Sequence, residues 1–316
     1  MKLFLRFTNP HGQAKKCFFR WSNPTQRQGV NPMVKFGCCL QGASFVLQAG
    51  DDNSISNDPF HRLKDNLALL LEHNYDFAEL TVGTLMGVPE DDFPNWVHMI
   101  QASGIDVPVL NSFIPRTIKL TGPDVNKDAI ENYLKIAFAR VKAIGATTIV
   151  FGSGGARSFP EGFSKSEAVR QVSAFLQMCS HYAAQYSIHV VIEPLNRKES
   201  NVINTVAEAL ELAKELRLPY ISVLADSYHM LEEQENLSVL SDAVASGLLT
   251  HVHIADRGRV FPGLPAPDGM DFRAFFQELH KSGYEGRISA ECRSDDFSVN
   301  SKRSLDYVRT LWASLS

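Results

Sequence analysis

The strongest constraint on the fold is an alternation that begins after Met33. Eight short apolar or β-branched runs, the expected strands, cover residues 34–40, 77–85, 107–114, 147–153, 189–195, 220–226, 249–256 and 286–292. Between and after them lie stretches with apolar residues at helical spacing, at 60–74, 92–104, 127–145, 166–187, 204–217, 237–247, 271–283 and 304–315. Strands that alternate with helices imply βαβ units and a parallel sheet.

Eight such units can close into a barrel, and a doubly wound open sheet is the competing arrangement. The open sheet usually carries a glycine-rich dinucleotide-binding motif after its first strand, and no such motif follows residues 34–40. The chain has 316 residues, of which 44% are hydrophobic, and a barrel of this kind needs about 250 residues. We therefore predict an α/β fold, a (β/α)8 TIM barrel, for residues 33–316.

The start of the chain differs from the rest. The first fifty residues contain seven Lys or Arg and no Asp or Glu, and Asp51 is the first acidic residue. An organellar transit peptide has this bias. We favour a simpler interpretation, in which residues 1–32 are a basic N-terminal extension, disordered or upstream of a true start at Met33.

Charge and cysteine content indicate a cytoplasmic protein that binds neither nucleic acid nor a membrane. The formal net charge of −4 gives no attraction to nucleic acid or to an anionic membrane, and no apolar run reaches the length of a membrane span. The five cysteines include no CxxC pair, so we expect reduced thiols, as in intracellular proteins.

Four of the later strands end in a residue that can bind a metal ion. Parallel strands are buried on both faces, so a charged residue there is costly unless it is paired or bound. The four residues are Glu193, Asp226, His253 and Glu291. The carboxyl ends of barrel strands converge on one mouth, where active sites are built.

Side-chain alternation supports this convergence. Each of the four residues shares a strand face with the residue two positions earlier, so each can point inward above an inner-layer partner. These partners are Val191, Leu224, His251 and Ser289. Three carboxylates and one imidazole suit Mg²⁺ or Mn²⁺, and the imidazole extends the range to Co²⁺ or Zn²⁺. A single such residue would more often be a hydrogen-bonded core residue, but four at separate strand ends favour a metal site.

Short segments around these residues resemble a known family, the xylose-isomerase-like barrels. Within it they are most similar to the ketose 3-epimerases, such as tagatose and psicose epimerases, and to sugar phosphate isomerase/epimerases. The segments are IEPLNRKESNVINT (192–205), LADSYHM (224–230), HVHIADRGRVFPG (251–263) and ISAE (288–291). The resemblance is densest between residues 186 and 292.

The resemblance implies that Glu193, Asp226, His253 and Glu291 bind one divalent metal, with Mn²⁺ expected first and Mg²⁺, Co²⁺ or Zn²⁺ as alternatives. It also implies that Glu193 and Glu291 are catalytic, exchanging a proton with the carbon beside the substrate carbonyl from opposite faces. A divalent cation would stabilise the resulting enediolate as a Lewis acid.

The resemblance also assigns substrate-binding positions to His229, Arg259 and Glu199. Each has a structural alternative from position alone. Arg259 is equally compatible with a charge on the rim, His229 with a helix cap, and Glu199 with an ion pair to Arg197 or Lys198.

The loop GSGGARS (152–158) bears on the substrate. Its backbone N–H groups and Arg157 could form a phosphate-binding nest. Glycine-rich loops are common after barrel strands, so this loop is only weak support for a sugar phosphate.

We predict a metal-dependent sugar or sugar phosphate isomerase/epimerase, with C3 epimerisation of a ketose as the expected reaction. An aldose–ketose isomerase, a hydroxypyruvate-type isomerase or an inosose dehydratase would use the same site. A silent sugar-binding barrel would not need both Glu193 and Glu291. The expected partner is a small sugar, and the exposed barrel helices would permit a homodimer or homotetramer.

A DNA-repair endonuclease of the same superfamily is the remaining alternative. It would need further histidines at the early strand ends, where this chain has Thr81, Gly83, Thr84 and Asn111. The acidic net charge also argues against a surface that follows phosphates.

Overall fold

The computed structural model describes residues 7–8, 14–15, 34–40 and 58–315. The chain divides into two units, Met1–Met33 and Val34–Ser316. In the first unit, the short strands β1 (Phe7–Thr8) and β2 (Ala14–Lys15) pair antiparallel. The predicted extension over residues 1–32 lies almost entirely outside the described residues and stays a prediction.

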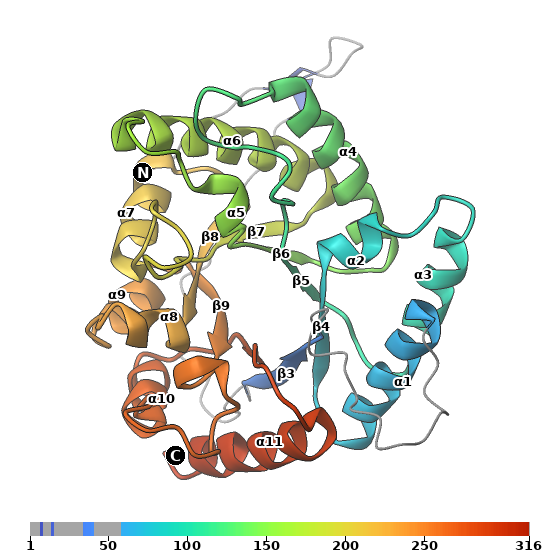
Figure 1. Cartoon of the computed structure of the whole chain (residues 1–316), viewed down its shortest axis with the longest axis vertical. Coiled ribbons are helices and arrows are strands. Elements are labelled where there is room, and N and C mark those ends of the chain that lie inside the picture. The colour runs from blue at the N-terminus through green and yellow to red at the C-terminus, as the bar shows by residue number, and fades with distance from the viewer. Residues whose placement is uncertain (1–6, 9–13, 16–33, 41–57, 316) are drawn as a thin grey trace. The chain divides into compact units, whose positions relative to one another are not determined.

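The second unit is a closed barrel of eight parallel strands, which lie at its centre in Figure 1. Each strand pairs with the next along the chain, and the last pairs with the first. The strands are β3 (Lys35–Cys39), β4 (Phe77–Thr81), β5 (Val109–Asn111), β6 (Thr148–Phe151), β7 (His189–Ile192), β8 (Ile221–Asp226), β9 (Leu249–Ile254) and β10 (Arg287–Ala290). The predicted TIM barrel is therefore confirmed, and the open doubly wound sheet is excluded.

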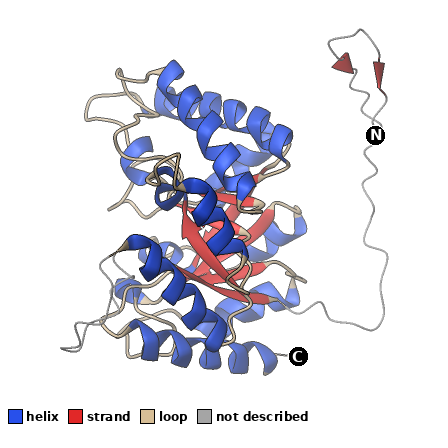
Figure 2. Cartoon of the chain, turned by 90° about the vertical axis from the view of Figure 1, so that its right-hand side faces the viewer, coloured by secondary structure: helices blue, strands red, loops and turns tan. Residues whose placement is uncertain are grey.

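Helices cover the outside of the strands (Figure 2), and eight of them in the described part of the chain follow the barrel strands in sequence. They are α1 (Pro59–Glu72), α3 (Phe93–Gln101), α4 (Lys127–Ala143), α6 (Lys165–Tyr186), α7 (Val206–Leu216), α9 (Val239–Ala245), α10 (Phe272–Lys281) and α11 (Phe297–Ala313). Several begin where a side-chain oxygen accepts a hydrogen bond from a backbone N–H of the first turn, as Asn126, Ser164 and Thr205 do. Within the described part of the chain, no helix combines the length and apolar character needed to cross a membrane.

Four short helical segments at the strand ends were not predicted: α2 (Val82–Met86), α5 (Gly154–Arg157), α8 (Ser227–Glu232) and the 3₁₀ turn η1 (Arg257–Arg259). The predicted strand over 77–85 is consequently wrong beyond Thr81. The Thr81 hydroxyl accepts from the N–H of Thr84 at 2.9 Å and starts α2.

The last helix also begins earlier than predicted, at Phe297 rather than at residue 304. The Asp296 side chain accepts from the N–H of Val299 at 3.1 Å, and this cap fixes the earlier start.

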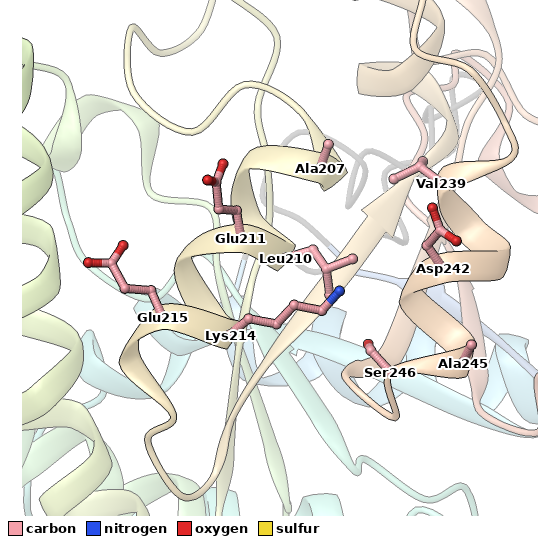
Figure 3. Close-up of a pocket in the computed structure, with 9 residues that line it drawn as sticks. All are labelled: Ala207, Leu210, Glu211, Lys214, Glu215, Val239, Asp242, Ala245 and Ser246. Atoms are coloured by element: carbon pink, nitrogen blue, oxygen red, sulfur yellow. The ribbon is translucent and has the colours of Figure 1, made fainter.

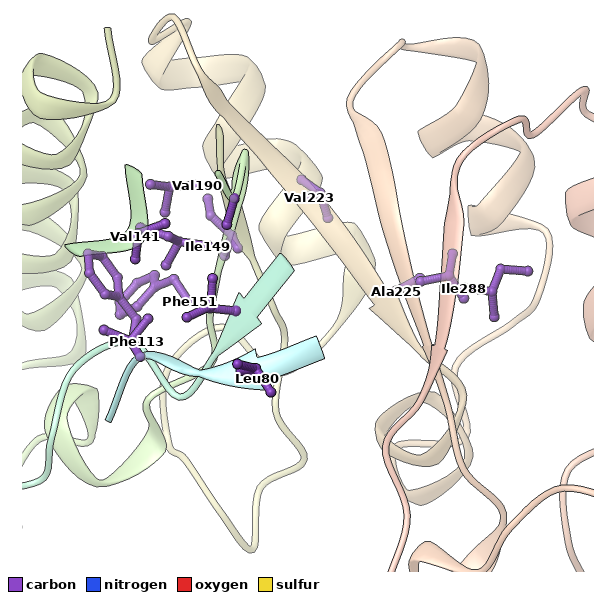
Figure 4. Packing of buried hydrophobic residues seen from close by; sticks show 14 of the residues in the cluster. Leu80, Phe113, Val141, Ile149, Phe151, Val190, Val223, Ala225 and Ile288 are labelled. Atoms are coloured by element: carbon purple, nitrogen blue, oxygen red, sulfur yellow. The ribbon is translucent and has the colours of Figure 1, made fainter. Parts of the chain in front are cut away.

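The strands bury side chains on both faces. A large cluster between strands and helices contains Val190, Val223 and Ala225 (Figure 4). Val191, which follows Val190, and Leu224, which follows Val223, belong to a separate cluster. Because successive side chains point to opposite faces, this second cluster lies inside the barrel. The predicted inward direction of Val191 and Leu224 is thus confirmed. Glu193 and Asp226, two positions further along the same strand faces, therefore lie at the mouth of the barrel.

Candidate active site

The four predicted metal ligands lie together. One potential ligand atom from each of them lies within 4.8 Å of those of the other three. Glu193, Asp226, His253 and Glu291 are 5%, 1%, 0% and 7% exposed. Three carboxylates and one imidazole from four strand ends therefore form one buried cluster.

Asp226 shows why this cluster fits a cation. Its Oδ1 accepts from the N–H of Tyr228 at 2.7 Å and so caps α8. Its Oδ2 is buried and has no hydrogen-bond partner among the described residues. A buried carboxylate oxygen without a donor is costly, and a bound cation would remove that cost.

His253 lies between the carboxylates. Its Nδ1 is 3.2 Å from Oε1 of Glu193 and 3.9 Å from Oε2 of Glu291. Its Nε2 points the other way and lies 2.9 Å from Oε1 of Glu79. Burial acts to lower the pKa of His253, but the charge of Glu79 and the other neighbours raise it well above its usual value.

The surroundings of Glu291 change its pKa. Burial, together with the negative charge of Glu193, raises the pKa of Glu291 to about 7, against the opposing effects of His253 and Arg259. The side-chain amide of Asn111 donates to Oε1 of Glu291 at 3.3 Å. A proton or a metal ion can therefore occupy this end of the cluster near neutral pH.

The three predicted substrate-binding residues lie beside this cluster. Nη1 of Arg259 donates to Oε2 of Glu291 at 2.6 Å, and Nη2 lies 3.1 Å from both carboxylate oxygens of Glu199. Nη2 also lies 3.2 Å from Nε2 of His229. Arg259 is therefore not an isolated rim charge, since it links one predicted ligand to two predicted substrate-binding residues.

The alternative role considered for Glu199, an ion pair with Arg197 or Lys198, is also wrong. Arg197 forms an ion pair with Glu233, and Lys198 forms one with Glu232. Glu199 thus pairs with Arg259 and with neither of its basic sequence neighbours.

His229 is oriented by the loop after β7. Its Nδ1 accepts a hydrogen bond from the backbone N–H of Asn196 at 3.0 Å. The proton of a neutral imidazole is then on Nε2. Nε2 lies 4.0 Å from Oδ2 of Asp226, so this end of the imidazole is directed at the cluster.

The predicted phosphate nest at residues 152–158 is wrong with respect to Arg157. This side chain is fully buried and donates to the backbone carbonyls of Phe151 and Ile203, each at 3.1 Å. Gly154 packs so closely that a Cβ there would lie 2.6 Å from the carbonyl oxygen of Glu199. The loop therefore packs against the segment after β7, and Arg157 is not directed at a ligand.

Sequence reasoning missed Glu79, which lies in β4 and is fully buried. It contacts His251 and Ser289 as well as His253. Burial acts to raise the pKa of Glu79, but the two histidines hold it well below its usual value. A charged residue in the middle of an otherwise buried strand was the signal that could have identified it.

A separate groove lies between α7 and α9, with a volume of about 890 Å³ (Figure 3). It is lined by Ala207, Leu210, Glu211, Lys214, Glu215, Val239, Asp242, Ala245 and Ser246. These residues lie on or next to outer helices, and none belongs to the cluster at the strand ends.

Comparison with known proteins agrees with this fold. The chain matches the xylose isomerase-like TIM barrel family over residues 67–311. This match covers most of the chain, so the protein belongs to the xylose isomerase-like TIM barrel family. The family predicted from the sequence is confirmed.

Two curated relatives that the chain resembles are both named as sugar epimerases. The chain is 36% identical to 3-dehydro-D-guloside 4-epimerase of Escherichia coli K12 over 144 residues, 45% of this chain and 53% of that protein. It is 35% identical to a ketose 3-epimerase of Arthrobacter globiformis over 133 residues, 42% of this chain and 44% of that protein. The chain thus spans about half the length of the curated relatives it matches.

Among solved structures, the apo form of the 3-keto-D-glucoside 4-epimerase of E. coli superimposes with a TM-score of 0.71. The alignment covers 88% of this chain and 100% of that chain, at 24% identity. This similarity shows the fold.

Proposed function

We propose that the protein is a metal-dependent sugar epimerase or isomerase, and that its reaction is the C3 epimerisation of a ketose. The observation that carries the proposal is the position of Glu193 and Glu291, two buried carboxylates that lie 3.2 and 3.9 Å from the Nδ1 atom of His253. The relatives named as epimerases support the same reaction class.

Glu193, Asp226, His253 and Glu291 would hold one divalent cation. Bound there, the cation would supply Lewis-acid stabilisation of negative charge on the substrate's carbonyl oxygen. The set contains no thiolate, and its three carboxylates favour Mn²⁺ or Mg²⁺, while the imidazole also admits Co²⁺ or Zn²⁺.

Glu193 and Glu291 would transfer the proton. One carboxylate removes the proton from the carbon beside the carbonyl, and the other returns a proton to the opposite face, which inverts that carbon.

Arg259 and His229 would bind the substrate oxygens. The Arg259 guanidinium supplies a fixed positive charge close to Glu291, where negative charge develops on the substrate. The Nε2–H of His229 supplies a second donor, and the hydrogen bond to the N–H of Asn196 holds that imidazole in place. Glu199 would orient Arg259 and accept a hydrogen bond from a sugar hydroxyl.

The site does not require a phosphorylated substrate. Arg157 uses its N–H groups on backbone carbonyls, so the reason for expecting a phosphate at residues 152–158 is removed. We propose an uncharged sugar, bound by hydroxyl and carbonyl contacts.

Hydrogen–deuterium exchange tests the proposal. Protein loaded with Mn²⁺ or Mg²⁺ is incubated in D2O with ketoses, ketose phosphates, small hydroxy-keto acids and inososes, and the products are read by NMR. We expect deuterium at C3 of a ketose together with its C3 epimer, and loss of both in excess chelator with recovery on adding metal. Deuterium in a hydroxy-keto acid, or loss of water from an inosose, would replace epimerisation by one of the alternative reactions. Full turnover in excess chelator would contradict metal dependence.

A further inference from the structure

Glu79 lies beneath the candidate metal centre and uses both of its carboxylate oxygens. Oε1 lies 2.9 Å from Nε2 of His253. Oε2 lies 2.9 Å from Nε2 of His251 and accepts from the hydroxyl of Ser289 at 2.7 Å. The side chain is fully buried, so no water competes for these contacts.

The two ring nitrogens of His253 face different partners. Nδ1 faces the carboxylates of Glu193 and Glu291, whereas Nε2 faces Glu79. A carboxylate can only accept at Nε2, so Nε2 must carry a proton. As long as Nε2 keeps its proton, only Nδ1 can offer a lone pair to a metal ion.

We propose that Glu79 is a positioning residue for the metal centre, which fixes the tautomer and ring orientation of His253 so that Nδ1 binds the cation. This inference rests on the proposed function, since it assumes that the four-residue cluster binds metal. A carboxylate that accepts from the second nitrogen of a ligating histidine raises the basicity of the ligand and restricts its rotation.

Glu79 contacts residues of the two strands that position the predicted ligands His253 and Glu291. His251 precedes His253 by two residues on β9, and Ser289 lies on β10 two residues before Glu291, which directly follows that strand. In the sheet, Ser289 is in register with His253. Glu79 therefore joins β4 to the two neighbouring strands β9 and β10 directly below the cluster, and a shift of either strand would change the direction of the His253 ring.

Cys39 offers a matched control, because its Sγ lies 4.0 Å from the same Nε2 atom of His253. Cys39, Glu79 and His253 also lie close enough to bind a cation of their own. If Glu79 acts as the hydrogen-bond acceptor of His253, removing the thiol should leave the metal centre nearly unchanged.

The test uses Co²⁺ alone as the probe, on the full chain. Titration calorimetry gives stoichiometry and affinity for the wild type, Glu79→Gln and Cys39→Ser. We expect one equivalent in each, with affinity about 10- to 100-fold weaker in Glu79→Gln and within about twofold of wild type in Cys39→Ser. If Glu79→Gln does not fold, Ser289→Ala removes one donor to Glu79, and a weaker affinity for Co²⁺ is expected there too.

A spectroscopic readout separates positioning from general stability. In the Co²⁺-loaded wild type, the Nε2 proton of a cobalt-bound His253 should give a single strongly shifted NMR signal that disappears in D2O. Glu79→Gln replaces the charged acceptor by a neutral one, so the signal should move and exchange faster with D2O in Glu79→Gln and stay unchanged in Cys39→Ser.

The outcomes distinguish this inference from the proposed function. A wild type that binds no Co²⁺ would refute the metal site itself. A wild type that binds one equivalent, with the same affinity and shifted signal in Glu79→Gln, would overturn the role of Glu79 alone. Two equivalents in the wild type, one of them lost in both Glu79→Gln and Cys39→Ser, would make Glu79 a ligand of a second cation and would also overturn it.

Discussion

The carboxylate of Glu193 lies against the backbone of Gly152, so closely that a Cβ on Gly152 would be 2.2 Å from Oε2 of Glu193. Gly152 directly follows β6, and Glu193 directly follows the neighbouring strand β7. The missing side chain at residue 152 therefore makes the space that the Glu193 carboxylate occupies.

Gly152→Ala should displace Glu193 from the cluster. Overpacking a buried site typically costs about 1–3 kcal/mol, and here the displaced group is a predicted ligand and base. We expect metal affinity and turnover to fall by about tenfold or more, measured by titration calorimetry and by initial rates. Gly83→Ala is the control, because a Cβ there meets nothing closer than Oγ1 of Thr81 at 3.6 Å. Equal behaviour of the two variants would contradict the steric role of Gly152.

Arg259 and Arg257 form a matched pair on the loop after β9. Arg259 contacts Glu291 and Glu199, whereas Arg257 pairs with Glu232 and is largely exposed. We expect Arg259→Met to lower kcat/KM by about 10²- to 10³-fold, because it removes fixed charge beside the reacting centre. Arg257→Met should stay within about twofold, because the Arg257 side chain bonds to Glu232 and to the backbone carbonyl of Asp268 and not to the cluster. A similar loss in both variants would show that the loop matters as a whole, and not the charge at residue 259.

His229→Ala should weaken substrate binding and leave the metal in place. Its Nε2 lies beside the cluster, but the residue is held through Nδ1 by the N–H of Asn196. We expect about a tenfold loss in kcat/KM, mostly through KM, as for one lost hydrogen bond. Metal content measured on the purified variant should match the wild type. Loss of the metal would make His229 a ligand.

Metal affinity should depend on pH through Glu291. Burial and the charge of Glu193 raise the pKa of Glu291 to about 7, so in the metal-free protein this carboxyl holds a proton below that pH. A metal ion must displace that proton, and the apparent affinity should fall as the pH drops below 7. Calorimetry in buffers of different ionisation enthalpy should show about one more proton released at pH 6 than at pH 8. The same proton release at both values would contradict the raised pKa.

The sequence allowed the barrel and the cluster to be predicted for a physical reason. Charged residues at the ends of buried strands are rare, and the closed sheet makes those ends meet. The residues carried over from the family resemblance, His229, Arg259 and Glu199, lie beside the cluster at short offsets from the strand ends.

What the sequence did not predict has physical causes too. The helices α2, α5 and α8 are too short to produce a periodic pattern. Arg157 looked like a ligand-binding residue because a glycine-rich loop does not reveal which side chains are buried beneath it. Glu79 was not predicted because it does not lie at a strand end. Its partners His251 and Ser289 lie one layer below the predicted ligands.

The most direct test of the two-carboxylate account follows deuterium from each C3 epimer separately. Glu193→Gln and Glu291→Gln are loaded with metal and incubated in D2O with each epimer of the ketose that the wild type converts. Each variant should lose epimerisation by about 10²- to 10⁴-fold, the usual contribution of a general acid or base. Because the remaining carboxylate reaches one face, Glu193→Gln should exchange deuterium at C3 of one epimer, and Glu291→Gln at C3 of the other. Wild-type turnover in either variant, or exchange with the same epimer in both, would contradict proton transfer by Glu193 and Glu291 from opposite faces.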